Sequence, residues 1–189
     1  MGMKTREVKL EMQFPAIYLL HGLGGSPNGS VSQLEAEMRV CEPEQNYVRP
    51  LMPHTDPRGP AWASVLHLRN IGVPTGSLII GVSLGGLVAA KLQELERPDL
   101  HVICISSPTH ADDVELAKRM EHRIALYSSA DEVILGRTER WTELAGAYDL
   151  PWLDHDTDKH KAPLGRILCA YVQGLDVSQE VKKIGAKGL

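Results

Sequence analysis

The sequence has 189 residues, 43% of them hydrophobic, and a formal net charge of -4. This length and composition predict a single globular domain, residues 1–189, with a sizeable core. The small negative charge provides no basic surface, so neither nucleic acid nor an anionic membrane is expected as a partner.

Cysteine usage and the N-terminal residues bear on the compartment. Cys41, Cys104 and Cys169 are far apart, and two of them lie in apolar runs, which favours buried free thiols in a reducing environment. The sequence MGMKTREVKL has no apolar signal-peptide core, and no later run approaches the roughly 18 apolar residues that cross a bilayer. We therefore expect a cytoplasmic protein. The sequence does not indicate its oligomeric state.

Short apolar runs alternate with stretches of helical spacing along the chain. The expected strands are residues 16–20, 46–52, 77–82, 101–106, 123–128 and 150–154. The expected helices are residues 30–40, 61–70, 84–96, 111–122, 139–148 and 163–175. Residues 5–12 alternate like an edge strand or an N-terminal arm, and residues 177–189 are expected to fray. The alternation predicts an α/β fold, a three-layer α/β/α sandwich around a mostly parallel sheet.

One serine stands between glycines where an expected strand meets an expected helix. In IIGVSLGGLV, Gly81 and Gly85 flank Ser83 at the spacing G-x-S-x-G. A tight turn from strand to helix strains its central residue and leaves room only for small neighbours, and it lifts the serine hydroxyl clear of the sheet. This pattern favours a nucleophilic serine. The alternative is a glycine-rich turn whose serine caps the helix.

A second glycine motif, HGLGG at residues 21–25, follows the first core strand. A glycine run there lets backbone N–H groups approach a substrate oxygen, as an oxyanion hole requires. The expected donors are the amides of Leu23 and of Leu84, the residue after Ser83. A dinucleotide-binding loop is the alternative, but the G-x-G-x-x-G spacing is missing. We expect neither a cofactor nor a metal.

The order of these motifs, HG-x-GG and then G-x-S-x-G in a strand and helix alternation, resembles the α/β-hydrolase family over nearly the whole chain. The resemblance implies the family's fold and a Ser, Asp or Glu, His triad in that chain order, with the acid two strands after the nucleophile and the histidine before the last helix. Only about one helix fits between residues 106 and 123, so no cap domain is expected.

The implied acid is Asp131, just beyond the expected strand 123–128, with Asp112 or Asp113 as the alternative. For the base, His155 and His160 both precede the last helix. We favour His160, because His155 adjoins the expected strand 150–154 whereas His160 lies on a loop.

The acidic loop that contains these histidines raises a metal alternative. Asp154, Asp156 and Asp158 alternate as in a calcium loop, but the glycine and the terminal glutamate of such a loop are absent. A solvated acidic loop is the preferred interpretation. His21, His54, Trp62 and His110 follow or adjoin strand ends and are candidates for the substrate pocket.

These observations predict a carboxylesterase-like serine hydrolase that acts on a small-molecule or acylated substrate through an acyl-enzyme. A site without a cap favours small or exposed acyl groups, or an acyl group carried by a larger partner. The alternatives are a thioesterase or peptidase with the same triad, and a binding protein that keeps the fold without the activity.

Overall fold

A computed structural model of the chain describes residues 13–54 and 59–186. Its main sheet has six parallel strands in the order β2-β1-β3-β4-β7-β8. The strands are β1 (Ile17–Leu20), β2 (Tyr47–Val48), β3 (Leu78–Val82), β4 (His101–Ile105), β7 (Arg123–Tyr127) and β8 (Gly146–Asp149). A separate antiparallel pair is formed by β5 (His110–Ala111) and β6 (Val114–Glu115).

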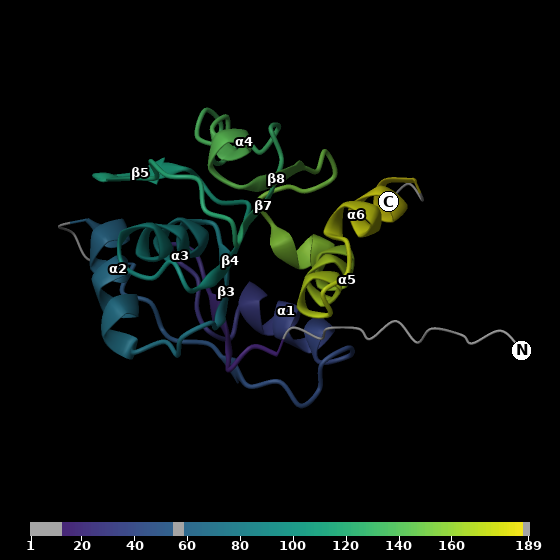
Figure 1. Cartoon of the computed structure of the whole chain (residues 1–189). Coiled ribbons are helices and arrows are strands. Elements are labelled where there is room, and N and C mark those ends of the chain that lie inside the picture. Colours follow the sequence, from purple (N-terminus) through teal and green to yellow (C-terminus); the bar gives the residue numbers. More distant parts are fainter. Residues whose placement is uncertain (1–12, 55–58, 187–189) are drawn as a thin grey trace, which may run out of the picture.

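Helices cover both faces of this sheet. They are α1 (Ser30–Met38), α2 (Pro60–Ile71), α3 (Leu84–Leu95), α4 (Trp141–Leu144), α5 (Lys161–Val172) and α6 (Val177–Ala186), with a 3₁₀ helix η1 (Thr157–His160) before α5. Figure 1 shows α2 and α3 on one side of the central strands and α1, α5 and α6 on the other. The predicted three-layer α/β/α fold is confirmed, with a fully parallel main sheet. No helix in the described ranges is long and apolar enough to cross a membrane.

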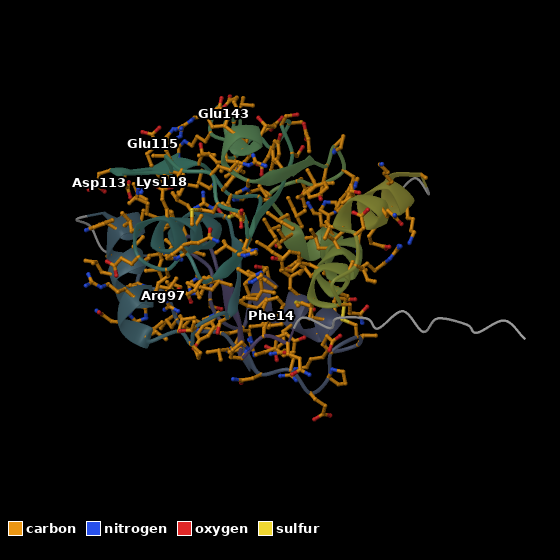
Figure 2. All side chains as sticks on the ribbon, viewed as in Figure 1. Phe14, Arg97, Asp113, Glu115, Lys118 and Glu143 are labelled. Atoms are coloured by element: carbon orange, nitrogen blue, oxygen red, sulfur yellow. A yellow bond between two sulfur atoms is a disulfide. The ribbon has the colours of Figure 1, made fainter. Side chains whose placement is uncertain are left out.

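The central strands explain the two layers. All five residues of β3 are buried, and their side chains alternate between the faces of the sheet. Ile79 packs in the core beneath α2 and α3, whereas Leu78 and Ile80 pack in the core beneath α1 and α5. Figure 2 shows side chains filling the space on both sides of the strands. A strand buried on both faces reads as a continuous apolar run, which is why β3 was predictable.

The prediction of a helix at residues 111–122 is wrong. The chain forms the β5–β6 hairpin there, and Asp112 at its turn has a positive φ of 52°. Beyond the hairpin, the Glu94 carboxylate accepts hydrogen bonds from the amides of Ala117 and Lys118. These amides are therefore satisfied without a helix. Between β4 and β7, the described chain contains this hairpin and no cap domain, as expected.

The boundaries between residues 139 and 154 also differ from the prediction. The helix expected at 139–148 shrinks to α4, because the chain turns extended at Ala145 and then forms β8. The last strand therefore ends at Asp149, and residues 150–154, which we expected to be a strand, follow β8 as a turn and loop.

The C-terminal segment, which we expected to fray, is helical. Residues Val177–Ala186 form α6, and Val177 and Ile184 are buried against the α1 and α5 side of the sheet. These two apolar side chains are seven residues apart and therefore lie on one face of the helix. A mostly polar segment can thus pack as a helix, because its few apolar residues share that face. The strand or arm expected at residues 5–12 lies outside the described residues.

The expectation of three free thiols is wrong for two cysteines. Cys41 and Cys169 form a disulfide, with their Cα atoms 6.2 Å apart. They come together because α1 and α5 pack side by side on one face of the sheet. Cys104 is free and buried, as predicted, and burial raises the pKa of its thiol to about 12.

Candidate active site

Ser83 lies in a strained turn between β3 and α3. Its φ of 51° and ψ of -123° fall where L-residues are rare, and its amide donates a hydrogen bond to the Ile105 carbonyl of the neighbouring strand at 2.8 Å. Ser83 is the residue before the first turn of α3, yet its side chain makes no capping hydrogen bond. The alternative of a simple helix-capping serine is therefore not supported, and the hydroxyl is directed elsewhere.

The flanking glycines are required by close backbone contacts. A Cβ atom added at Gly81 would lie 2.3 Å from the Gly86 nitrogen, and one at Gly85 would lie 2.6 Å from the Leu20 carbonyl oxygen. Both distances are shorter than any real contact of a Cβ atom. Only glycine fits at these two positions, so the turn that presents Ser83 depends on the G-x-S-x-G spacing.

The Ser83 hydroxyl meets His155 rather than His160. His155 Nε2 lies 3.0 Å from Ser83 Oγ, and His155 Nδ1 lies 2.8 Å from Asp131 Oδ2. The carboxylate can only accept, so Nδ1 carries the proton and Nε2 is free to accept the Ser83 O–H. Asp131 is buried, and its other oxygen accepts the Val133 amide at 3.0 Å. The predicted Ser83 and Asp131 are thus joined through a histidine.

The preference for His160 is corrected by the position of β8. Since that strand ends at Asp149, His155 lies six residues beyond it on a loop, the position we expected for the base. His160 ends η1, where its Nε2 lies 3.4 Å from Asp154 Oδ1 and its ring lies 5.6 Å from the Trp152 ring.

Two contacts fix the loop that carries His155. The Asp154 carboxylate accepts the Asp156 amide at 2.9 Å, which turns the chain around His155. The Ser106 hydroxyl, on the loop after β4, donates to the Asp154 carbonyl at 3.2 Å. The histidine is therefore held by its own loop and by the loop of a strand adjacent to β3 in the sheet.

The HGLGG loop lies against this serine. A Cβ atom added at Gly22 would lie 2.9 Å from Ser83 Cβ, so the loop approaches the serine closely. In the described part of the chain, the amides of Leu23 and Leu84 donate no hydrogen bond, and both residues border the pocket at Ser83. These two N–H groups are therefore free to bind an oxygen atom at the serine.

His21 and His54 lie behind that loop and support it. His21 Nδ1 donates to the Gly22 carbonyl at 2.9 Å, and its Nε2 accepts the Met52 amide at 3.0 Å. His54 Nε2 donates to the His21 carbonyl, and its Nδ1 accepts the Ser64 hydroxyl, both at 2.7 Å. Burial lowers the pKa of His54 to about 4, so the ring is neutral at pH 7. These histidines position the loop and do not line a pocket with Ser83.

Two hollows adjoin Ser83 and His155. The apolar pocket, of about 470 Å³, has walls from Leu84, Pro108, Val133 and Ile134. The polar pocket, of about 270 Å³, is bordered by Ser30, Asp156, Thr157 and Asp158. Leu23 borders both hollows and is itself 64% exposed. Ser83 thus lies where an apolar group and a polar group can be held on its two sides.

Several predicted pocket residues lie elsewhere, and several pocket residues were missed. Trp62 and His110 border neither hollow, and the neighbouring Ala111 and Asp112 border the apolar one instead. Asp112 makes no contact with His155; its carboxylate faces the Ala61 amide of α2 at 3.4 Å. The missed Val133, Ile134 and Arg137 follow Asp131 on the same loop, so position after the predicted acid was the signal available for them.

The acidic loop with Asp154, Asp156 and Asp158 was the candidate metal site in the sequence. No group of three His, Cys, Asp or Glu side chains that could hold a metal ion occurs among residues 13–54 and 59–186. Asp156 instead forms an exposed ion pair with Lys159 at 3.3 Å. The side chains of Asp154 and Asp156 are both exposed, and their carboxylates lie 3.9 and 3.3 Å from Lys159 Nζ.

The parallel sheet and the serine at the turn between β3 and α3 are features of the α/β-hydrolase fold, and solved structures share this fold. An α/β hydrolase enzyme from the metagenome of lagoon sediments at Mar Chica, Morocco, matches with a TM-score of 0.67 at 14% identity, over 87% of this chain and 93% of its own. A Xanthomonas campestris protein assigned to the α/β hydrolase superfamily matches with a TM-score of 0.66 at 20% identity, over 85% and 99%.

A third similar structure is the α/β hydrolase domain-containing protein 10 from mouse, with a TM-score of 0.63 at 14% identity, over 87% of this chain and 90% of its own. Compared with protein-family models and with curated proteins, the sequence matches none. The chain has the α/β-hydrolase fold.

Proposed function

We propose that the protein is a serine hydrolase that cleaves ester bonds through Ser83, His155 and Asp131. The observation that carries this proposal is the continuous chain of hydrogen bonds from the buried Asp131 carboxylate, through both nitrogens of His155, to the Ser83 hydroxyl. A nucleophile, its base and the group that orients the base stand within hydrogen-bonding distance of one another, as acyl transfer requires.

The reaction follows from the roles of these atoms. His155 Nε2 takes the Ser83 proton as Oγ attacks the ester carbonyl carbon, and Asp131 stabilises the imidazolium that forms. The amides of Leu23 and Leu84 donate to the oxyanion of the tetrahedral intermediate. His155 then gives the proton to the departing alcohol oxygen, and a water molecule, deprotonated by His155, cleaves the acyl-enzyme to release the acid and restore Ser83.

The hollows support an ester with an apolar acyl chain. The apolar pocket offers leucine, proline, valine and isoleucine walls, whereas the polar pocket offers the Ser30 and Thr157 hydroxyls and two carboxylates. We assign the acyl chain to the apolar pocket and the alcohol to the polar pocket, because apolar surface gains most from leaving water. An alcohol also needs less help in leaving than an amine, which favours ester over amide bonds at an open site.

The test is hydrolysis of ethyl hexanoate by the purified protein and by Ser83→Ala, with Ser129→Ala as control. Ser129 is an exposed serine that borders neither hollow. The expected result is hydrolysis by wild type and Ser129→Ala, and a loss of at least about a thousandfold in kcat for Ser83→Ala. Equal hydrolysis by wild type and Ser83→Ala would refute the proposal. The rates at which the same variants hydrolyse the matched hexanoyl thioester and amide compare the activity on the other two bond types.

A further inference from the structure

One charged group on the wall of the apolar pocket has no role in the chemistry described above. Arg137 borders this pocket together with Ser83 and His155. Every other arginine in the described ranges has a hydrogen bond or an ion pair: Arg39, Arg49, Arg69, Arg97, Arg119, Arg123, Arg140 and Arg166. In the same ranges, only the main chain of Arg137 makes hydrogen bonds and its guanidinium makes neither a hydrogen bond nor an ion pair, so its five N–H donors are available to a ligand.

The main chain of Arg137 is fixed to the pocket wall. Its amide donates to the Ile134 carbonyl at 3.0 Å, and its carbonyl accepts from both the amide and the hydroxyl of the buried Thr109, at 2.8 and 3.1 Å. Ile134 is itself buried and borders the same pocket. The Arg137 side chain is exposed, but these hydrogen bonds hold its backbone in place at the edge of the pocket.

Among the described residues, one carboxylate borders the same pocket, and it is directed to another partner. Asp112 faces the Ala61 amide at the N-terminal end of α2, where the helix dipole favours a negative charge. Although both residues border the pocket, no ion pair joins the side chains of Asp112 and Arg137 in the described structure. The apolar pocket therefore presents apolar walls, the reacting serine and a guanidinium that has no ion-pair partner among the described residues.

We infer that Arg137 binds an anionic group on the acyl part of the substrate, so that the preferred ester is a half-ester of a dicarboxylic acid. This inference rests on the proposed function and names the substrate class of that site. A planar guanidinium binds a carboxylate through two parallel hydrogen bonds, which gives orientation as well as affinity. Hydrolysis consumes one water molecule and yields the alcohol and the free dicarboxylate, with the second carboxylate unchanged.

Two esters of matched length test the inference. Monoethyl adipate and ethyl hexanoate share the ethanol leaving group and a six-carbon acyl chain, and differ in a terminal carboxylate. Wild type should hydrolyse monoethyl adipate with about tenfold higher kcat/KM. Arg137→Gln should lose about tenfold on monoethyl adipate and change less than about twofold on ethyl hexanoate. Arg137→Lys should retain part of the preference, because it keeps the charge but not the planar pair of donors.

Arg140→Gln is the control, because it removes the same charge from a side chain that borders neither hollow. Arg140 pairs with Glu115 and Glu143, both of which Figure 2 shows at the outer edge of the molecule. The Arg140→Gln variant should hydrolyse both esters with the wild-type kcat/KM. Unchanged hydrolysis of ethyl hexanoate also shows that Arg137→Gln is folded.

Three results would overturn the inference. They are equal kcat/KM for the two esters in wild type, an equal loss on both esters in Arg137→Gln, and a preference for the hexanoyl ester of glycolate, which carries its carboxylate on the alcohol side. Failure of the proposed function gives a different result, since neither ester would then show hydrolysis that depends on Ser83.

Discussion

His54 is a buried, neutral histidine that joins two segments behind the HGLGG loop. It holds the His21 carbonyl through one ring nitrogen and the Ser64 hydroxyl of α2 through the other. A second proton on the ring would convert Nδ1 from acceptor to donor and place a charge in a site that is 2% exposed. The support of the loop therefore depends on the neutral ring.

Acid should destabilise the fold through this residue. The folded-state pKa of His54 is about 4, below its unfolded value of 6.5, so its contribution is complete above pH 6.5 and is lost as the pH falls toward 4. Across that window, the free energy of unfolding should fall by up to about 3 kcal/mol on account of His54. Urea unfolding at several pH values measures this fall.

The matched variants are His54→Asn and His110→Asn, the latter at an exposed histidine of β5. His54→Asn should be less stable at pH 7 and should show a shallower dependence on pH between 6.5 and 4. His110→Asn should keep the wild-type dependence. An unchanged slope in His54→Asn would show that other groups carry the acid sensitivity.

At the residue scale, the sequence allowed Ser83, Asp131 and the candidate amides of Leu23 and Leu84 to be predicted from local motifs and from the family resemblance. The histidine could not be decided in the same way. Two histidines five residues apart satisfied the expected order, so the choice between them depended on where the last strand ends. The apolar segment LPWLD at residues 150–154 suggested a strand there, whereas β8 ends at Asp149. Packing of Leu150 and Leu153 against the sheet, not strand pairing, explains those apolar residues.

A disulfide joins the segment that follows α1 to α5, and the two helices also pack against each other. The disulfide between Cys41 and Cys169 closes a separation of 128 residues and lies beside the hollow between the two helices. A link across so long a segment restricts the unfolded chain strongly. It joins the helix that follows the HGLGG loop to the helix that follows His155.

Removing this link should lower stability and spare the site. Cys41→Ala with Cys169→Ala, or reduction of wild type, should lower the free energy of unfolding by about 2–5 kcal/mol, measured by urea unfolding. The rate of ester hydrolysis under native conditions should change little, because neither cysteine borders a hollow at Ser83.

Thiol titration of the denatured protein provides the direct check on the disulfide. One thiol, that of Cys104, should react before reduction and three should react after it. Reductant should leave the stability of the double variant unchanged. Three reactive thiols in protein that was never reduced, or no effect of reductant on wild type, would contradict the disulfide.

The elements that sequence reasoning placed well are the buried ones. In β3 and β4, every residue except His101 is buried, and their apolar runs leave little choice of structure. The segment 111–122 was misread because its letters suit a helix, while its backbone is satisfied by the Glu94 carboxylate from α3. Such a long-range partner is not visible in local periodicity.

On the scale of the whole molecule, the fold gathers the reacting groups at one edge of the sheet. Ser83 follows β3, the HGLGG loop follows β1, and Asp131 and His155 lie beyond β7 and β8. All these strands run parallel, so their carboxyl ends meet at the same edge. The alternation of strands and helices was sufficient to predict this edge, but the walls of the two hollows come from loops whose paths no pattern predicts.

Covalent labelling shows directly whether His155 activates Ser83. The measurement is the rate at which a fluorophosphonate modifies wild type, Ser83→Ala, His155→Ala and His160→Ala, read by intact mass. We predict one label on wild type, none on Ser83→Ala, labelling slowed by at least about a hundredfold in His155→Ala, and a near-normal rate in His160→Ala. No label on wild type, or slowing in His160→Ala alone, would contradict the account.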